Sequence, residues 1–157
     1  MTELDLIIDF HLNADRQGPG STNETLRALD FIDIKNKDRL KIADVGCGTG
    51  AQTITLGQHL NCNIIAIDLA DKFLQKLNKN ANDLGLNDKI STLNSPMENL
   101  PFEDEEFDII WSEGAIYNIG FKEGIRQWKR YLKKGGYLAV SELSWITKDR
   151  PKEIEEY

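Results

Sequence analysis

The chain has 157 residues, 19 of them basic and 26 acidic, so its formal net charge is −7. This length suits a single domain that buries roughly 70% of its unfolded surface, and 40% hydrophobic with 29% charged residues predict a soluble globular fold. The acidic balance argues against nucleic acid or an anionic membrane as the main partner, because binding phosphates needs a basic surface.

The first forty residues contain two expected helices on either side of a break. A short helix is expected near the N-terminus, and RQGPGS (16–21) then interrupts regular structure, since its glycines and proline disfavour helix and strand. Ser21 or Thr22 is a suitable N-cap for a second helix that extends to about Asp33.

From Leu40 onward, short apolar runs alternate with helical patterns. The expected strands are LKIADV (40–45), NIIAID (63–68), KISTLN (89–94), FDIIWS (107–112) and YLAVSEL (137–143). Helices are expected from the glycine loop to about Leu60, over 71–85 with Gly85 as the stop, and from Lys122 to Leu132, before a turn at KKGG (133–136). The last residues, DRPKEIEEY (149–157), have the pattern of the first turns of another helix.

This alternation predicts an α/β domain with a doubly wound parallel sheet and helices on both faces. Ligands of such sheets bind beyond the carboxyl ends of the strands, at the topological switch point. The whole chain is expected to form one domain, with an N-terminal helical cap (1–38) and a Rossmann-like core (39–157).

The strongest motif is DVGCGTG (44–50), directly after the first strand. Its glycines allow a sharp turn and a close approach of the backbone to a ligand, and the N–H groups at the following helix start favour an anionic group. Gly46, Gly48 and Ala51 also fit the dinucleotide-binding pattern. The loop alone therefore does not choose between NAD and another nucleotide-like ligand.

Acidic residues around the loop narrow this choice. Asp68 ends the second strand, where a carboxylate would bind ribose hydroxyls of either ligand. Asp44 precedes the loop and Glu113 follows the fourth strand, so both should border the same crevice. Added carboxylates repel a pyrophosphate and favour a ligand that carries ammonium and sulfonium charges, as S-adenosylmethionine does.

The ordered set of motifs resembles the class I S-adenosylmethionine-dependent methyltransferases. The set comprises DVGCGTG (44–50), IIAID (64–68), MENLPF (97–102) and FDIIWSEGAIYNI (107–119). RQGPGS (16–21) and WSEGAIYNIGF (111–121) resemble a bacterial subgroup that methylates small molecules. The resemblance covers nearly the whole chain and implies a Rossmann-like methyltransferase fold.

The resemblance implies roles for individual residues by position. Gly46, Cys47, Gly48 and Gly50 would line the methionine part of S-adenosylmethionine, with Asp44 near its amino group, Asp68 on the ribose and Leu69 on the adenine; Met97 and Glu98 would lie near the adenine edge, and Glu113 near the methionine end. Many relatives have Gly-Asp or Gly-Ser ahead of the segment that matches MENLPF, whereas this chain has Ser95 and Pro96. Pro96 has no N–H with which to contact the adenine.

Methyl transfer from a sulfonium is an in-line displacement, for which a protein chiefly aligns the reactants and excludes water. Candidate catalytic residues near the mouth are Glu113, His11 and Tyr117, with Glu142 as a further candidate. A neutral histidine is a suitable base at pH 7. Arg16, followed by Gln17, is expected to close over the cofactor and to pair with its carboxylate; Tyr117 and Trp145 are candidate aromatic walls.

The C-terminal end bears on completeness and assembly. Methyltransferases of this class continue past the fifth strand, so the resemblance implies that the C-terminal strands are missing and that YLAVSEL (137–143) is an exposed sheet edge. An exposed edge favours pairing with another chain, which predicts a homodimer through that edge.

Cysteine usage and apolar runs bear on the compartment. Cys47 and Cys62 have neither disulfide-framework nor metal-ligand spacing, which predicts reduced buried thiols, no metal site and a cytoplasmic location. The N-terminus lacks a signal-peptide pattern and no apolar run reaches the roughly 20 residues of a membrane helix.

The leading hypothesis is a methyltransferase that transfers a methyl group from S-adenosyl-L-methionine to a small molecule and releases S-adenosyl-L-homocysteine. Two alternatives stay open: a non-catalytic domain that binds S-adenosylmethionine, and an NAD-dependent oxidoreductase. The acidic charge, and SEGA (112–115) after the fourth strand, argue against nucleic-acid methylation.

Overall fold

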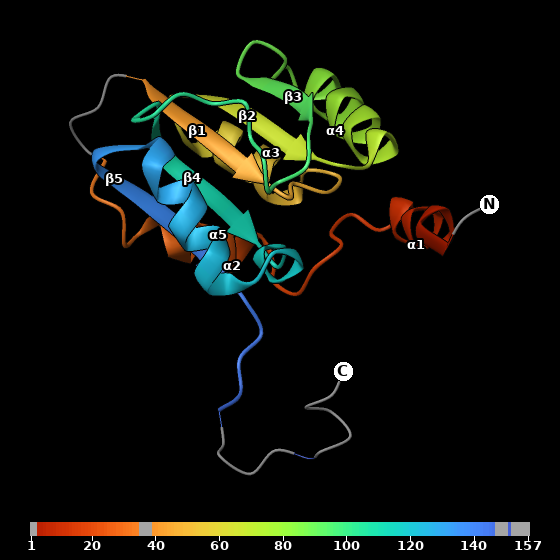
Figure 1. Cartoon of the computed structure of the whole chain (residues 1–157). Coiled ribbons are helices and arrows are strands. Elements are labelled where there is room, and N and C mark those ends of the chain that lie inside the picture. The colour runs from red at the N-terminus through yellow and green to blue at the C-terminus, as the bar shows by residue number, and fades with distance from the viewer. Residues whose placement is uncertain (1–2, 35–38, 147–150, 152–157) are drawn as a thin grey trace.

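The computed structural model describes residues 3–34, 39–146 and 151, which form a five-stranded sheet with helices on both faces (Figure 1). The elements follow in chain order as α1 (Glu3–Leu12), α2 (Thr22–Leu29), β1 (Leu40–Val45), α3 (Ala51–His59), β2 (Cys62–Asp68), α4 (Asp71–Asp83), β3 (Ile90–Asn94), β4 (Phe107–Glu113), α5 (Phe121–Trp128) and β5 (Leu132–Ser141), with short 3₁₀ turns at Ile116–Asn118 and Lys129–Tyr131.

The strands lie in the order β3-β2-β1-β4-β5 and every neighbouring pair is parallel. The chain moves outward to β3 and then returns to the other side of β1, so the switch point lies between β1 and β4. The predicted doubly wound sheet is therefore confirmed.

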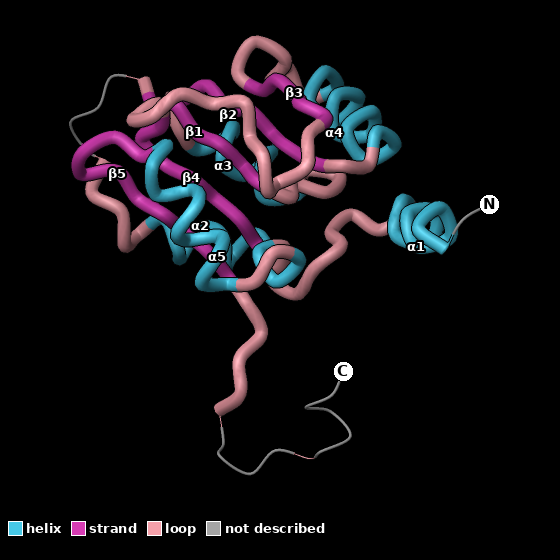
Figure 2. Tube along the Cα trace, in the orientation of Figure 1, coloured by secondary structure: helices cyan, strands magenta, loops and turns pink. Residues whose placement is uncertain are grey.

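Two apolar layers hold the helices against the sheet. Neighbouring strand residues point to opposite faces, so Ile42 packs with the layer under α2, α3 and α4, whereas Ala43 packs with the layer that contains Trp128 of α5. Figure 2 shows α2 and α3 behind the sheet and α5 in front of it. Trp111 and Trp128 are both buried.

The N-terminal helix α1 stands beside α4, apart from the sheet (Figure 1). Lys72 pairs with Asp9 at 2.6 Å, and the Lys76 ammonium donates to the carbonyl oxygens of Leu12 (2.7 Å) and Ala14 (3.0 Å). The chain then runs past the strand ends to α2. We call residues 13–21 the strap, because they cross the carboxyl edge of the sheet.

Three boundaries differ from the sequence prediction. Helix α2 ends at Leu29 instead of Asp33, because the next amides bond to carbonyls three residues back, from Asp30 to Arg27 (3.2 Å) onward. Helix α5 ends at Trp128 and continues as a 3₁₀ turn. The expected turn at 133–136 is wrong: these residues belong to β5, whose pairing with β4 is irregular between Phe107 and Ile109.

Other expectations are not tested by the described residues. The expected helix at 149–157 lies outside them, apart from Pro151. The division into a cap (1–38) and a core (39–157) remains a prediction.

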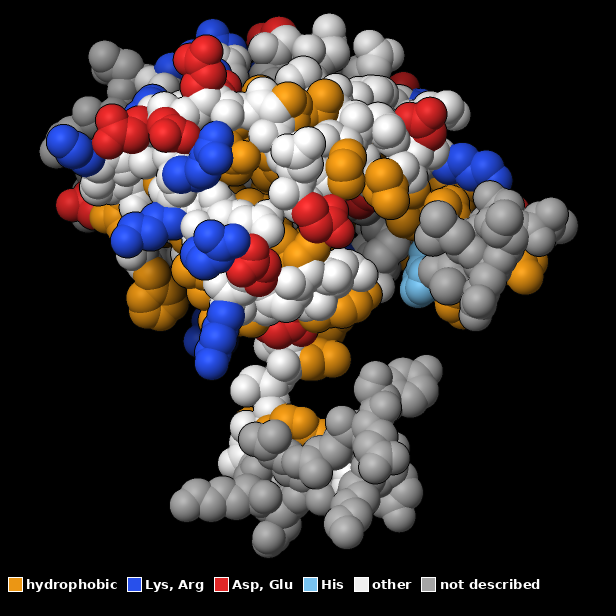
Figure 3. All heavy atoms as spheres, viewed as in Figure 1, with side chains coloured by type: hydrophobic (Ala, Val, Ile, Leu, Met, Phe, Trp, Pro, Cys, Tyr) orange, Lys and Arg blue, Asp and Glu red, His pale blue; other side chains and the backbone are white. Residues whose placement is uncertain are grey.

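The face shown in Figure 3 intersperses acidic with basic side chains over α5 and its neighbouring loops, and it shows no single basic patch there.

Candidate functional site

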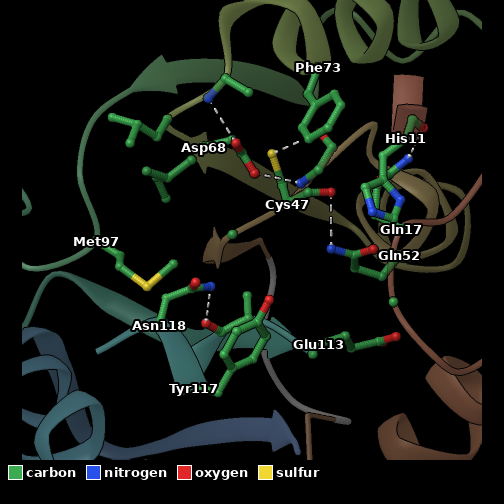
Figure 4. Close-up of a pocket in the computed structure, with 18 of the residues that line it drawn as sticks. His11, Gln17, Cys47, Gln52, Asp68, Phe73, Met97, Glu113, Tyr117 and Asn118 are labelled. Carbon is green, nitrogen blue, oxygen red and sulfur yellow. Dashed lines mark hydrogen bonds between the residues drawn. The ribbon is translucent and has the colours of Figure 1, made fainter. Parts of the chain in front are cut away.

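A cavity of about 480 Å³ lies at the carboxyl edge of the sheet, between the strand ends and the strap. Its volume falls within the range of about 300–1,000 Å³ that is common for small-molecule sites. Asp68, Cys47 and Met97 face it from the strand side, while His11 and Gln17 face it from the N-terminal side (Figure 4). We call this cavity the crevice.

The glycine loop turns the chain from β1 into α3. Gly46, Cys47 and Gly48 line the crevice. Gly50, at the start of α3, is not among the lining residues. Its φ is +88°, and a Cβ there would lie 2.1 Å from Cδ1 of Leu77, so this glycine allows α3 to pack closely on α4.

Asp68 ends β2 and lines the crevice. Its Oδ2 accepts the Gly48 N–H at 2.9 Å, and its Oδ1 accepts the Ala70 N–H at 2.9 Å. Each carboxylate oxygen has a second acceptor position, so Asp68 is fixed in orientation and still able to accept hydrogen bonds from a pair of ligand hydroxyls.

Asp44 lies beneath the loop, is fully buried and is not among the residues that line the crevice. Its carboxylate accepts from Thr53 Oγ1 at 2.5 Å and from Gln52 Nε2 at 3.3 Å. Burial raises the pKa of Asp44 from its ordinary value to about 7, against the lowering effect of these two donors. Asp44 is therefore connected to the crevice through its hydrogen bond with Gln52, which does line it.

Glu113, at the end of β4, lines the crevice and joins three elements. It forms a part-buried ion pair with Arg16 of the strap. Its Oε1 also accepts from Thr25 Oγ1 of α2 at 2.7 Å and from Trp111 Nε1 at 2.8 Å. The negative charge of Glu113 is thus offset by the Arg16 guanidinium.

A second contact holds the strap on the glycine loop. Gln17 Oε1 accepts the Thr49 N–H at 2.9 Å, and Gln17 Nε2 donates to Thr49 Oγ1 at 2.9 Å. Gly48 allows this approach, since a Cβ there would lie 2.4 Å from Gln17 Oε1. The backbone N–H of Thr49, just before α3, is therefore already hydrogen-bonded to the Gln17 side chain.

The outer crevice is more apolar. Leu69 lines it with 62% of its surface exposed, and Met97, Pro96 and Glu98 line it from the loop after β3. The Met97 carbonyl accepts from Trp128 Nε1 at 3.0 Å, which anchors this loop on α5. Leu69, Pro96 and Met97 give the crevice that Asp68 also lines an apolar wall.

Candidate proton-transfer residues lie at the mouth. His11 lines the crevice from α1, and Tyr117 lines it with 63% of its surface exposed. Burial raises the pKa of the Cys47 thiol well above its ordinary value, so this thiol stays protonated at neutral pH. Trp145 and Glu142 are not among the crevice residues.

Several lining residues escape the sequence prediction, notably Gln52, Phe73 and Asn118. Gln52 and Phe73 follow the glycine loop and Asp68 by a few residues, so position in the first turn of each helix was an available signal. Asn118 donates to the Ala115 carbonyl at 2.9 Å, a local turn that no pattern in the sequence marks.

Three further findings concern the described residues alone. They contain no group of three or more histidine, cysteine or acidic residues arranged to hold a metal ion. None of the helices described is long and apolar enough to cross a membrane. The two cysteines are free and buried.

Residues 43–140 match a family described as a methyltransferase domain. A sterol 24-C-methyltransferase of Debaryomyces hansenii is 27% identical over 144 residues, which cover 90% of this chain and 38% of that protein. The chain therefore spans about two fifths of the length of this curated relative.

Solved structures share the fold. YjhP of Escherichia coli has a TM-score of 0.81 and 19% identity, covering 96% of this chain and 61% of its own. Geranyl diphosphate C-methyltransferase of Streptomyces coelicolor, solved with Mg²⁺, geranyl diphosphate and S-adenosyl-L-homocysteine, has a TM-score of 0.70 and 17% identity, covering 76% of this chain and 42% of its own.

Proposed function

The chain belongs to the methyltransferase domain family, and on that premise we propose that it binds S-adenosyl-L-methionine in the crevice and transfers its methyl group to a small molecule. The observation that carries the proposal is the orientation of Asp68. Its carboxylate is bonded to the backbone of the glycine loop and opens on a cavity of about 480 Å³ with an apolar outer wall. This arrangement suits a nucleoside with two ribose hydroxyls.

The donor set of the crevice fits the parts of this cofactor. Asp68 would accept from the ribose hydroxyls, while Leu69 and Met97 would pack on the adenine. Glu98 and backbone groups remain for the adenine edge, since Pro96 has no N–H. The loop residues Gly46, Cys47 and Gly48 would line the methionine part, which carries the ammonium that the buried Asp44 charge attracts.

When bound, S-adenosylmethionine supplies a methyl group on a sulfonium, which needs alignment more than activation. The strap lies along one side of the crevice, held by Arg16 on Glu113 and by Gln17 on Thr49, and would shield that side of a bound cofactor from water. Glu113 already accepts from three side chains, so we assign it a positioning role. His11 and Tyr117 are the groups at the mouth that can move a proton.

The acceptor, compartment and assembly are part of the same proposal. A small-molecule acceptor is supported by the net charge of −7, which disfavours nucleic acid, and by the sterol and geranyl diphosphate named for two similar proteins. Two buried cysteines that form no disulfide support a cytoplasmic location. The position of β5 at the edge of the sheet supports a homodimer through that strand.

Calorimetric titration tests the cofactor. We expect wild-type protein to bind S-adenosylmethionine and S-adenosylhomocysteine with micromolar affinity and not to bind NAD. Asp68→Ala should weaken both adenosyl ligands at least tenfold, because the ribose hydroxyls lose a charged acceptor, worth roughly 1.5–3 kcal/mol.

The matched control is Asp71→Ala, since Asp71 is exposed in the first turn of α4 and does not line the crevice. This variant should bind like the wild type. Binding of NAD in preference to the adenosyl ligands, or equal losses in the two variants, would contradict the proposal. Thermal melting of each variant checks that the fold is retained.

A further inference from the structure

The strap and α1 supply one side of the crevice. Ile8 and His11 of α1 line it, as do residues 16–19 of the strap. Figure 4 shows His11 and Gln17 next to one another on this side, where Gln17 Nε2 donates to the His11 carbonyl at 3.2 Å. Whatever holds these two segments in place therefore sets the shape of the crevice on that side.

Apolar packing does little to hold α1. The helix has ten residues, a length at which an isolated helix is marginal in water. Leu6 and Phe10 are 56% and 80% exposed, so neither removes much apolar surface from water. The ion pair between Asp9 and Lys72 of α4 is half exposed on both sides, and such pairs contribute little. The contacts at the carboxyl end of α1 therefore decide where the helix lies.

Lys76 of α4 serves this carboxyl end. A helix leaves its last carbonyl groups without partners inside the helix. The Lys76 ammonium donates to the Leu12 carbonyl at 2.7 Å, in a contact that is partly buried. A positive charge at this end of a helix is also favoured by the helix dipole. Lys76 is thus well placed to fix the last turn of α1 on α4.

The Ala14 carbonyl, in the strap, brings three segments together. It accepts from Lys76 Nζ of α4 at 3.0 Å and from Gln17 Nε2 of the strap at 3.1 Å, and the Thr49 hydroxyl of the glycine loop lies 3.4 Å away. Of these three side chains, Lys76 alone carries a charge, and hydrogen bonds from charged donors are the stronger ones. We call these four residues the junction.

Lys76 itself lies outside the crevice. It is half-buried along α4 and is not among the residues that line the cavity. A ligand in the crevice would therefore not contact it. An effect of Lys76 on binding has to pass through the end of α1 and through the junction.

We propose that Lys76 is a positioning residue for the crevice. Through the Leu12 carbonyl it holds α1 at the mouth, and through the Ala14 carbonyl it holds the strap on the glycine loop. Without its ammonium, these carbonyls lose their charged donor, and α1 and the strap open more often. The effect on cofactor binding rests on the proposed function, whereas the effect on the strap does not.

Trypsin reports on the strap directly. Arg16 is the first lysine or arginine of the chain, so a cut after it releases residues 1–16 as one fragment, which mass spectrometry follows. Proteases cut segments that open locally. Lys76→Met keeps a long side chain without the donor and should release this fragment about fivefold faster than the wild-type 157-residue chain. Lys76→Arg restores a charged donor and should return the rate to that of the wild type.

Two controls separate local from global effects. Lys79→Met removes an exposed ammonium of the same helix, one that pairs with Asp83, and should release residues 1–16 at the wild-type rate. A cut after Arg126, in α5 and thus against the other face of the sheet, reports general unfolding. The rate of that cut should be the same in all variants. Circular dichroism and thermal melting check that each variant folds.

Calorimetric titration with S-adenosylhomocysteine measures the effect on the crevice. Affinity should fall about fivefold in Lys76→Met, because one side of the site is no longer held in place. It should recover in Lys76→Arg and be unchanged in Lys79→Met. Saturating S-adenosylhomocysteine should also slow the release of residues 1–16 from the wild type, since the ligand binds against the strap.

The two measurements keep the two proposals apart. If the wild type does not bind S-adenosylhomocysteine, the proposed function fails, and the release of residues 1–16 decides the role of Lys76. If S-adenosylhomocysteine binds and Lys76→Met changes neither the release nor the affinity, the role of Lys76 fails and the proposed function stands. Faster release with unchanged affinity, no recovery in Lys76→Arg, or an equal rise in the cut after Arg126 would also overturn the role of Lys76.

Discussion

Asp44 is the residue whose surroundings depart most from those of an ordinary carboxylate. It is wholly enclosed, its donors are Thr53 and Gln52, and the charges of Glu113 and Asp68 add to the effect of burial in raising its pKa to about 7. A positive ligand in the crevice would favour its ionised form. In the free protein its ionisation opposes folding.

The pH dependence of stability should show this directly. Because the pKa of Asp44 is about 7 in the folded protein and near its ordinary value of 3.8 in the unfolded chain, the folded state holds the proton more tightly. Stability should therefore fall as pH rises from about 4 to 7. Between pH 5 and 8 the wild type should lose about 2–3 kcal/mol relative to Asp44→Asn, measured by urea unfolding at each pH.

Asp71→Asn provides the control, since its side chain is exposed in the first turn of α4. It should keep the pH dependence of the wild type. If Asp44→Asn instead tracks the wild type across this range, the Asp44 carboxylate does not titrate there.

At the scale of elements, the loop that joins β1 to α3 depends on close contact with α4. Gly50 has a φ of +88° and would place a Cβ 2.1 Å from Leu77, whereas Gly85 has a φ of +68° with no atom within 4 Å of the added Cβ. Gly85→Ala therefore meets backbone strain alone, about 1–2 kcal/mol. Gly50→Ala meets strain and a clash.

Gly50→Ala should destabilise the protein by about 1–3 kcal/mol more than Gly85→Ala, measured by urea unfolding. In a Leu77→Ala background the extra cost of Gly50→Ala should disappear, because the clashing methyl groups are gone. Equal costs for the two glycine substitutions in the wild-type background would show that α4 moves aside freely.

The elements themselves were largely predictable. The runs at 40–45, 63–68 and 89–94 are apolar and flanked by polar turns, and each became a strand within a residue of its expected start. The turn predicted at KKGG (133–136) was wrong because two adjacent glycines are typical of a turn. In the structure, pairing with β4 extends β5 back to Leu132 and includes these residues in the strand. Local propensity did not include that long-range pairing.

The lining of the crevice was predictable where a motif follows a strand directly, as at Asp68 and the glycine loop. It was not predictable where partners lie far apart in the chain. Arg16 was expected on a cofactor carboxylate, and the structure puts it on Glu113, 97 positions away. No periodic pattern in the sequence connects these two residues. The pairing of Glu113 with Arg16 could therefore be seen only in the folded structure.

At the scale of the whole molecule, the sheet has two unequal edges. Strand β3 has five residues and β5 has ten, and both lie at an edge of the sheet. A long edge strand offers more backbone groups for pairing with a second chain. Assembly should therefore proceed through β5.

Sedimentation velocity tests this assembly. We expect a dimer whose fraction rises with protein concentration. Ser141→Lys puts a charge at the exposed end of β5 and should lower the dimer fraction, whereas Ser91→Lys on β3 should leave it unchanged. A single monomeric species at all concentrations, or equal effects of the two substitutions, would exclude the β5 interface.

The two contacts that hold the strap, Gln17 with Thr49 and Arg16 with Glu113, become possible at different stages of synthesis, because a chain is made from its N-terminus. Gln17 and Thr49 are separated by 32 positions, so both have been made long before the fourth strand. Arg16 finds Glu113 only after the fourth strand has been made, across a separation of 97. Of the two contacts that hold the strap, the one between Arg16 and Glu113 can therefore form only later.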